Sequence, residues 1–173
     1  KVVTIDHDLT LPTGIAIQDG DLYVGAVNKL LVYQNIDQTF ESSPKPHVLY
    51  DELPEETHHG WKYLGFSPED KLFFNVGATC NVCETENPWF APIMSLDLDR
   101  EPLQPEIFTS GVCNTAGFTW HPGTGATTIL IDGWLKNNVA WGRPTDILEM
   151  PEGSLLIADD HANVIYRLTY ETP

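Results

Sequence analysis

Short apolar runs alternate with turn residues along most of the chain, and the alternation within the runs has a period of two. Residues 11–33 contain three such runs, separated by Asp19-Gly20-Asp21 and by Asn28-Lys29. A period of two places successive side chains on opposite faces of a strand, and Asp, Gly and Asn favour turns. The pattern therefore predicts a small antiparallel meander here. Helical periodicity is almost absent from the whole chain.

The central segment, residues 57–83, has the sequence THHGWKYLGFSPEDKLFFNVGATCNVC. Two apolar runs flank the tetrapeptide SPED, which has the composition of a turn, and this arrangement predicts a β-hairpin. The adjacent pair His58 and His59 precedes the hairpin, and Cys80 and Cys83 follow it. A functional centre is therefore expected around this hairpin.

Residues 34–56 are rich in Pro, Ser, Glu and Asp and read as a long connection. Its one apolar island, residues 47–50, predicts a short strand. Further strands are predicted at residues 91–97 and 107–109, on either side of a proline-containing loop.

The later part of the chain repeats the plan of the hairpin. Residues 111–131 read as a strand ending in Trp120, a turn and a β-branched strand, and residues 142–170 repeat the plan with a third strand. Repeated meanders of three or four strands are typical of a β-propeller. We therefore predict an all-β fold, a partial or shortened propeller of about four blades, in a single domain over residues 1–173.

The chain has 173 residues and a formal net charge of -16, with 25 acidic and 9 basic residues. A surface this negative repels phosphate backbones and anionic lipid, so neither nucleic acid nor a membrane is an expected partner. The sequence contains no apolar run long enough to span a bilayer. The scattered acidic residues favour an extracellular, periplasmic or luminal setting.

The three cysteines allow one disulfide and one free thiol. Cys80 and Cys83 could form a redox pair, half of a zinc site or a structural disulfide. No second pair at zinc-site spacing exists, and the sequence after Cys83 reads as a loop, so the disulfide is favoured in an oxidising compartment, with Cys113 free. Asp159-Asp160 lacks the alternating ligand spacing of a calcium loop and reads as a turn.

Five segments resemble the soluble pyrroloquinoline quinone (PQQ) dependent sugar dehydrogenases, in the sorbosone-type branch of the glucose/sorbosone dehydrogenase group. They are LPTGIAIQDGDLYV, THHGWKYLGFSPEDKLFF, NVGATCNVCETENP, GVCNTAGFTWHPGTG and WGRPTDILEMPEGSLLIADDHANVIYRLTY, and they follow the family's order. Members of this family are six-bladed propellers with the quinone in a cleft at one end. The resemblance thus implies a shortened member with blades missing.

The resemblance also implies chemistry. His59, with His58 as an offset alternative, is similar by position to the family's general base, which takes a proton from the sugar C1 hydroxyl while hydride passes to the quinone. Asn114 and Arg143 match positions near the quinone, and PQQ and calcium are the implied cofactors. On residue chemistry alone, the histidines read as a polar pair at the start of a strand, bonded to loop backbone. For Asn114 and Arg143 a structural and a functional role are equally consistent with the residues, and Arg143 could pair with Asp146.

Cys113 points to a second function. The family usually has a quinone-contacting arginine where this chain has Cys113, which favours a non-catalytic interaction module or a subunit of a larger assembly. In either case open blade edges are expected at residues 1–5 and 127–131. A protein partner or further chain segments are expected to cover them and the segment 134–141.

Overall fold

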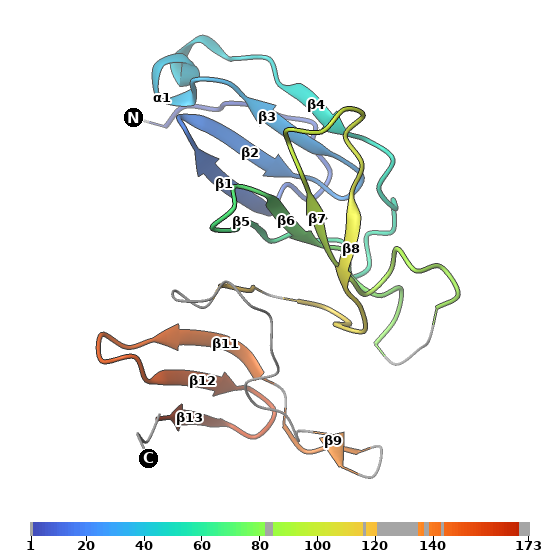
Figure 1. Cartoon of the computed structure of the whole chain (residues 1–173), viewed down its shortest axis with the longest axis vertical. Coiled ribbons are helices and arrows are strands. Elements are labelled where there is room, and N and C mark those ends of the chain that lie inside the picture. The colour runs from blue at the N-terminus through green and yellow to red at the C-terminus, as the bar shows by residue number, and fades with distance from the viewer. Residues whose placement is uncertain are drawn as a thin grey trace. The chain divides into compact units, whose positions relative to one another are not determined.

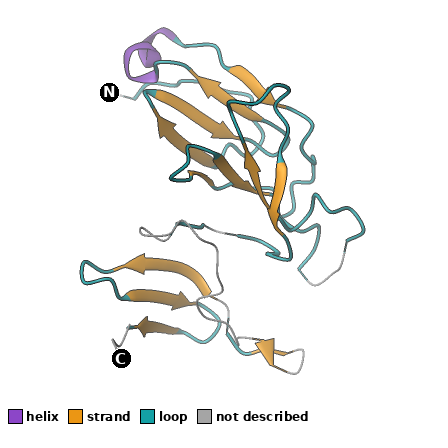
Figure 2. Cartoon of the chain, viewed as in Figure 1, coloured by secondary structure: helices purple, strands orange, loops and turns teal. Residues whose placement is uncertain are grey.

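The computed structural model describes residues 2–81, 85–115, 117–120, 135–136, 139–142 and 144–169, and most of them lie in antiparallel sheets or their connections (Figures 1 and 2). Helical structure in the described part is limited to α1 (Ile36–Thr39) and a 3-10 turn (Phe40–Ser42). The predicted all-β class is thus confirmed. No helix among these residues has the length and apolar character that crossing a membrane requires.

The chain divides into two compact units, Lys1–Gly125 and Ala126–Pro173. The first sheet of the first unit is the predicted meander, and its strands are neighbours in sequence order. They are β1 (Gly14–Gln18), β2 (Asp21–Gly25), β3 (Leu30–Tyr33) and β4 (His47–Tyr50). Asp19 and Gly20, with φ of 53° and 85°, make the left-handed turn between β1 and β2. The single-domain organisation stays a prediction.

The second sheet of this unit contains the predicted central hairpin and again follows sequence order. Its strands are β5 (Leu64–Phe66), β6 (Leu72–Asn75), β7 (Ile93–Leu96) and β8 (Glu106–Thr109). In the hairpin turn, the Ser67 hydroxyl oxygen accepts hydrogen bonds from the backbone N–H groups of Glu69, at 3.2 Å, and Lys71, at 3.3 Å. Ser67 is therefore the residue that stabilises the turn.

The main core of the first unit takes side chains from both sheets and from the connection between them. Its buried members are Leu30, Leu53, Leu64, Leu72, Phe74, Val76, Met94 and Leu96. A smaller cluster includes Val24, Leu31 and Tyr33, against which Ile5 packs. Residues 2–5, part of the expected open edge, pair with no strand in the described part of the chain. Ile5 is instead used in packing, and the Tyr33 hydroxyl binds the neighbouring Asp6 carboxylate.

Aromatic rings gather on the second face of the β5–β8 sheet. Leu72 and Phe74 belong to the core, so the intervening Phe73 points to the opposite face. There its ring lies edge-on to Trp120, with 5.2 Å between ring centroids, and Trp120 lies edge-on to Phe118 at 5.5 Å. The prediction of a strand ending in Trp120 is wrong for residues 117–120, which are not in a strand. These residues contact the sheet through their rings rather than through a ladder of backbone bonds.

The second unit has a three-stranded antiparallel sheet in sequence order, as predicted for residues 142–170. Its strands are β11 (Pro144–Glu149), β12 (Leu155–Asp159) and β13 (Val164–Leu168), and a two-stranded pair is formed by β9 (Leu135–Lys136) and β10 (Val139–Ala140). One Asp159 carboxylate oxygen accepts bonds from the N–H groups of His161, at 3.1 Å, and Ala162, at 2.8 Å. Asp159 therefore caps a turn, in agreement with the sequence-based interpretation.

Candidate functional site

Residues 57–60, here called the histidine turn, lead into the second sheet through a tightly packed backbone. The Gly60 N–H donates to the Thr57 carbonyl at 3.0 Å, and His59 has a left-handed φ of 52°. A Cβ atom on Gly77 would lie 2.2 Å from the His59 carbonyl oxygen, so only glycine fits beside the turn at this position. The close approach of Gly77 sets where the His59 backbone lies.

The His59 ring is oriented by one backbone contact. Its Nδ1 lies 3.0 Å from the carbonyl oxygen of Ala78. A carbonyl oxygen can only accept, so Nδ1 carries the proton and, in the neutral ring, Nε2 keeps its lone pair. The His58 ring lies 4.0 Å and the Trp61 ring 5.9 Å from the His59 ring, measured between centroids. His59 is half-buried and His58 is exposed.

Backbone contacts bring the segment around Cys113 to the same place. The Ala78 N–H donates to the Cys113 carbonyl at 2.7 Å, and the Cys113 Sγ lies 4.0 Å from the Asn81 carbonyl oxygen. Residue 78 therefore contacts both His59 and Cys113. The structure joins two predicted site segments, those of His59 and Asn114, that are far apart in sequence. Arg143, the third predicted site residue, lies outside the described residues.

Asn114 and Thr115 present an unusual feature beside this junction. The Asn114 side-chain oxygen and the Thr115 hydroxyl are both buried, and neither has a hydrogen-bond partner in the described part of the chain. Buried polar atoms in native proteins normally bond to protein, water or ligand. A group that donates a hydrogen bond to the Asn114 side-chain oxygen would therefore satisfy that atom.

Lys62 is a feature of the site that sequence reading did not single out. Its side chain is 3% exposed, and its ammonium donates to the Gly60 carbonyl of the histidine turn at 3.2 Å. Burial lowers the pKa of Lys62 from its ordinary 10.5 to about 8. Gly25 makes room for it, since a Cβ there would lie 2.8 Å from the Lys62 Cβ. The period-two pattern contained the signal, because position 62 shares a face with the buried Leu64.

Two polar side chains hold residues 61–63 before β5 begins. The Asn75 side chain accepts from the Tyr63 N–H at 2.6 Å and donates to the Trp61 carbonyl at 3.2 Å. The Thr13 hydroxyl accepts from the Lys62 N–H at 2.9 Å and donates to the Lys62 carbonyl at 3.3 Å. The backbone between the histidine turn and the sheet is thereby satisfied on both sides. This positions His59 and Lys62 relative to each other.

The cysteines follow the predicted division as far as the described residues extend. Cys80 is disulfide-bonded, and Cys113 is a free, exposed cysteine. Cys83, the predicted partner of Cys80, lies outside the described residues. Among the residues that the structure describes, no group of three His, Cys, Asp or Glu side chains is placed to hold a metal ion.

Comparison with known proteins finds an uncharacterized relative and no matching family model. No protein family profile matches the chain. An uncharacterized protein of Borreliella burgdorferi is 31% identical over 132 residues, which cover 70% of this chain and 34% of the relative. The chain thus spans about a third of the length of the curated relative it matches. This likeness carries no functional assignment.

Proposed function

We propose that the chain is part of a β-propeller of the PQQ-dependent sugar dehydrogenase type, in which His59 is the general base that accepts a proton from a sugar hydroxyl. The consecutive four-stranded meanders of the first unit support the blade architecture, since such a meander is the unit from which propellers are built. The sugar and the oxidation chemistry come from the sequence resemblance.

The orientation of the His59 ring is the observation on which this proposal depends. With Nδ1–H bound to the Ala78 carbonyl at 3.0 Å, the lone pair of Nε2 is the proton acceptor of the ring. When Nε2 takes up the hydroxyl proton, the ring becomes a cation, and the Ala78 carbonyl dipole stabilises the charge through the same hydrogen bond. The left-handed His59 backbone, packed closely against Gly77, fixes the point from which the ring extends.

The quinone, when bound, would supply the acceptor for the hydride. The described residues around the histidine turn and Cys113 do not by themselves fit a quinone with several carboxylates. They provide the Asn114 amide, the neutral Cys113 thiol and the buried ammonium of Lys62, which is already bonded to the Gly60 carbonyl. Carboxylates are best matched by cationic donors, and arginine most of all. Retention of PQQ and calcium would therefore depend on other residues, and no step is derived through them.

Exposed apolar side chains support the view that further protein covers these sheets. Ile15 and Ile17 on β1 are 66% and 68% exposed, and Ile147 on β11 and Ile165 on β13 are 59% and 70% exposed. In a propeller, both faces of an interior blade pack against neighbouring blades. The disulfide at Cys80 supports an oxidising setting outside the cytoplasm.

Sugar-dependent dye reduction tests the catalytic proposal. The 173-residue chain, supplied with PQQ and calcium, should reduce an electron-accepting dye when an aldose is added. His59→Gln should lower the rate by about 10²–10⁴-fold, the usual range for a general base. His161→Gln, in a turn of the second unit, is the matched control and should leave the rate unchanged. Sugar-dependent reduction that is unchanged in His59→Gln, or that falls equally in His161→Gln, would contradict the proposal.

A second candidate function is a non-catalytic propeller module that binds another protein. Cys113 favours it, because an exposed neutral thiol stands where the family usually carries the arginine that contacts the quinone. Equilibrium dialysis separates the two candidates. A chain that retains PQQ supports the dehydrogenase, whereas a folded chain that does not retain it supports the interaction module.

A further inference from the structure

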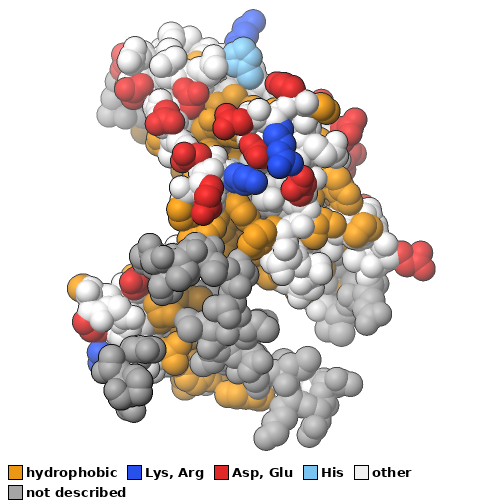
Figure 3. Space-filling model, in the orientation of Figure 1, with side chains coloured by type: hydrophobic (Ala, Val, Ile, Leu, Met, Phe, Trp, Pro, Cys, Tyr) orange, Lys and Arg blue, Asp and Glu red, His pale blue; other side chains and the backbone are white. Residues whose placement is uncertain are grey.

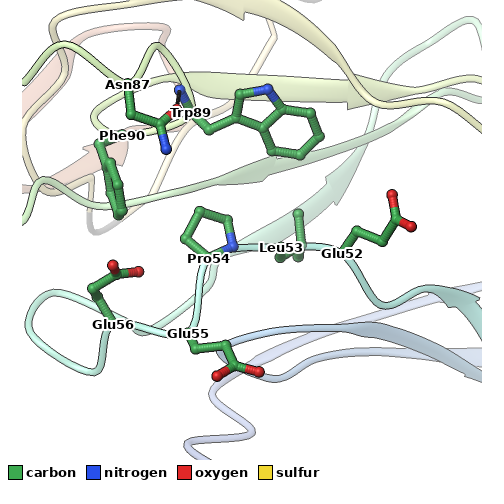
Figure 4. A pocket seen from close by; sticks show the side chains of 8 residues that line it. All are labelled: Glu52, Leu53, Pro54, Glu55, Glu56, Asn87, Trp89 and Phe90. Carbon is green, nitrogen blue, oxygen red and sulfur yellow. Dashed lines mark hydrogen bonds between the residues drawn. The ribbon is translucent and has the colours of Figure 1, made fainter.

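A pocket of about 440 Å³ lies in the first unit between the connection that follows β4 and the loop that precedes β7 (Figure 4). Neither segment carries a site residue predicted from the sequence. The lining residues are Glu52, Leu53, Pro54, Glu55, Glu56, Asn87, Trp89 and Phe90. In Figure 4 the Trp89 and Phe90 side chains lie on one side of the pocket, facing Leu53 and Pro54.

The aromatic wall of this pocket is held in place by contacts outside it. The Trp89 ring stacks on Tyr50, with 6.0 Å between centroids and 18° between planes. The Asn87 side-chain oxygen accepts a hydrogen bond from the backbone N–H of Trp89 at 3.0 Å. The Asn87 backbone carbonyl accepts one from the backbone N–H of Phe90 at 3.2 Å. The Trp89 ring and the backbone that carries both rings are therefore positioned before any ligand arrives, which reduces the entropy lost on binding.

The opposite wall is anchored as well, and it carries the charges. Leu53 is buried, and its N–H donates to the Asn28 carbonyl at 3.3 Å. The Glu56 backbone lies close against the histidine turn, since a Cβ on Gly60 would lie only 2.7 Å from the Glu56 carbonyl oxygen. In Figure 4 the Glu56 carboxylate turns toward Phe90, whereas Glu55 points away from the rings.

The charged side chains that line the pocket are hydrogen-bond acceptors. Its lining includes three glutamates and no lysine, arginine or histidine. Ionised carboxylates only accept hydrogen bonds, and the Asn87 side-chain oxygen is already engaged. Acidic side chains are also spread over the visible face of the first unit, with few basic ones among them (Figure 3). The field at the pocket thus attracts positive charge.

We propose that this pocket binds an organic cation, a guanidinium or ammonium group on an apolar stem, between the aromatic side chains Trp89 and Phe90 and the carboxylate of Glu56. An aromatic face attracts a cation through its quadrupole, and a carboxylate accepts its N–H groups. Leu53 and Pro54 contact the stem. A neutral sugar lacks the charge, and an inorganic cation lacks the stem. This binding is separate from the oxidation proposed above and does not depend on it.

Calorimetric titration with matched ligands tests the charge requirement. Arginine amide with its α-amino group acetylated should bind the 173-residue chain. Citrulline amide acetylated in the same way is its neutral near-isostere and should bind at least tenfold more weakly. Glucose should not compete. An arginine-containing tetrapeptide distinguishes the sources of the cation, because tighter binding than arginine amide indicates a protein segment and equal binding indicates a small molecule. Absence of arginine amide binding at millimolar concentrations, or equal binding of citrulline amide, overturns the proposal.

Pocket variants test the location. Glu56→Gln and Trp89→Leu should each weaken arginine amide binding by about threefold to thirtyfold, the range expected for loss of one charge-assisted or cation–π contact. Glu69→Gln removes one exposed charge in the β5–β6 turn and should change the affinity less than twofold. Glu56→Gln alters a surface side chain and keeps the fold. Its affinity for arginine amide therefore tests the location of the site even if Trp89→Leu unfolds. Unchanged affinity in Glu56→Gln, or equal loss in Glu69→Gln, overturns the proposal.

Discussion

Replacing Lys62 with methionine removes a buried positive charge from the first unit. The Lys62 side chain is 3% exposed, and the Gly60 carbonyl is its hydrogen-bond partner among the described residues. Methionine has a similar length and no charge, so it fills the same space with little repacking. The substitution therefore isolates the free energy of burying the ammonium.

The magnitude follows from the pKa of Lys62, which burial lowers from 10.5 to about 8. Each pKa unit corresponds to about 1.4 kcal/mol, so burying the charged form costs the folded state about 3 kcal/mol at pH values below 8. Loss of the hydrogen bond to the Gly60 carbonyl offsets about 1 kcal/mol of the gain. We expect Lys62→Met to raise the free energy of unfolding by about 2 kcal/mol at pH 7.

The pH dependence supplies a sharper test than the magnitude. Between pH 8 and 10.5 the folded protein releases the Lys62 proton before the unfolded chain does, so the unfolded state binds more protons there. The stability of the wild-type protein should therefore rise with pH across this window relative to the variant. Urea unfolding of both proteins from pH 7 to pH 11 measures the difference, in which other titrating groups cancel. Lys45→Met controls for the loss of one exposed positive charge.

Two results would refute this reasoning. A Lys62→Met protein that is less stable than the wild type at pH 7 would show that the ammonium is net stabilising where it lies. A stability difference that stays constant between pH 8 and 10.5 would show that Lys62 does not titrate in that window.

Two further predictions concern the packing of the histidine turn and the state of the cysteines. Gly77→Ala should destabilise the protein by about 1–3 kcal/mol or more and shift the His59 ring proton signals in NMR spectra, because the added Cβ would lie 2.2 Å from the His59 carbonyl oxygen. Gly117→Ala, whose Cβ would make ordinary 3.5 Å contact with Tyr63, should be tolerated, and equal effects of the two changes would contradict the argument. Iodoacetamide should label Cys113 in the native protein and leave Cys80 unmodified until a reductant is added, as peptide mass mapping can check. Labelling of Cys80 without a reductant would show that its disulfide does not form.

Strands and turns of the first unit could be predicted because their determinants are local. The island at residues 47–50 coincides with β4, and the tetrapeptide SPED is the turn between β5 and β6. One error arose where a short apolar segment was predicted as a strand. Residues 117–120 pair with no strand, and there ring packing replaces a backbone ladder.

The sequence alone also pointed to His59, Asn114 and the cysteines, through residue type and resemblance, but it could not say which of them meet. The contact of Ala78 with both His59 and Cys113 joins residues 19 and 35 positions apart along the chain. The burial of Lys62 depends on Gly25 of the other sheet, and the pocket depends on the approach of residues 52–56 to residues 87–90.

Alternation of period two and turn chemistry act over a few neighbouring residues, so the amino-acid sequence by itself determined the all-β class and most strand positions. Burial of a charge, orientation of an imidazole ring and formation of a pocket depend on which distant segments pack together. Those contacts are set by the two sheets as they share a core, and only the tertiary structure decided them.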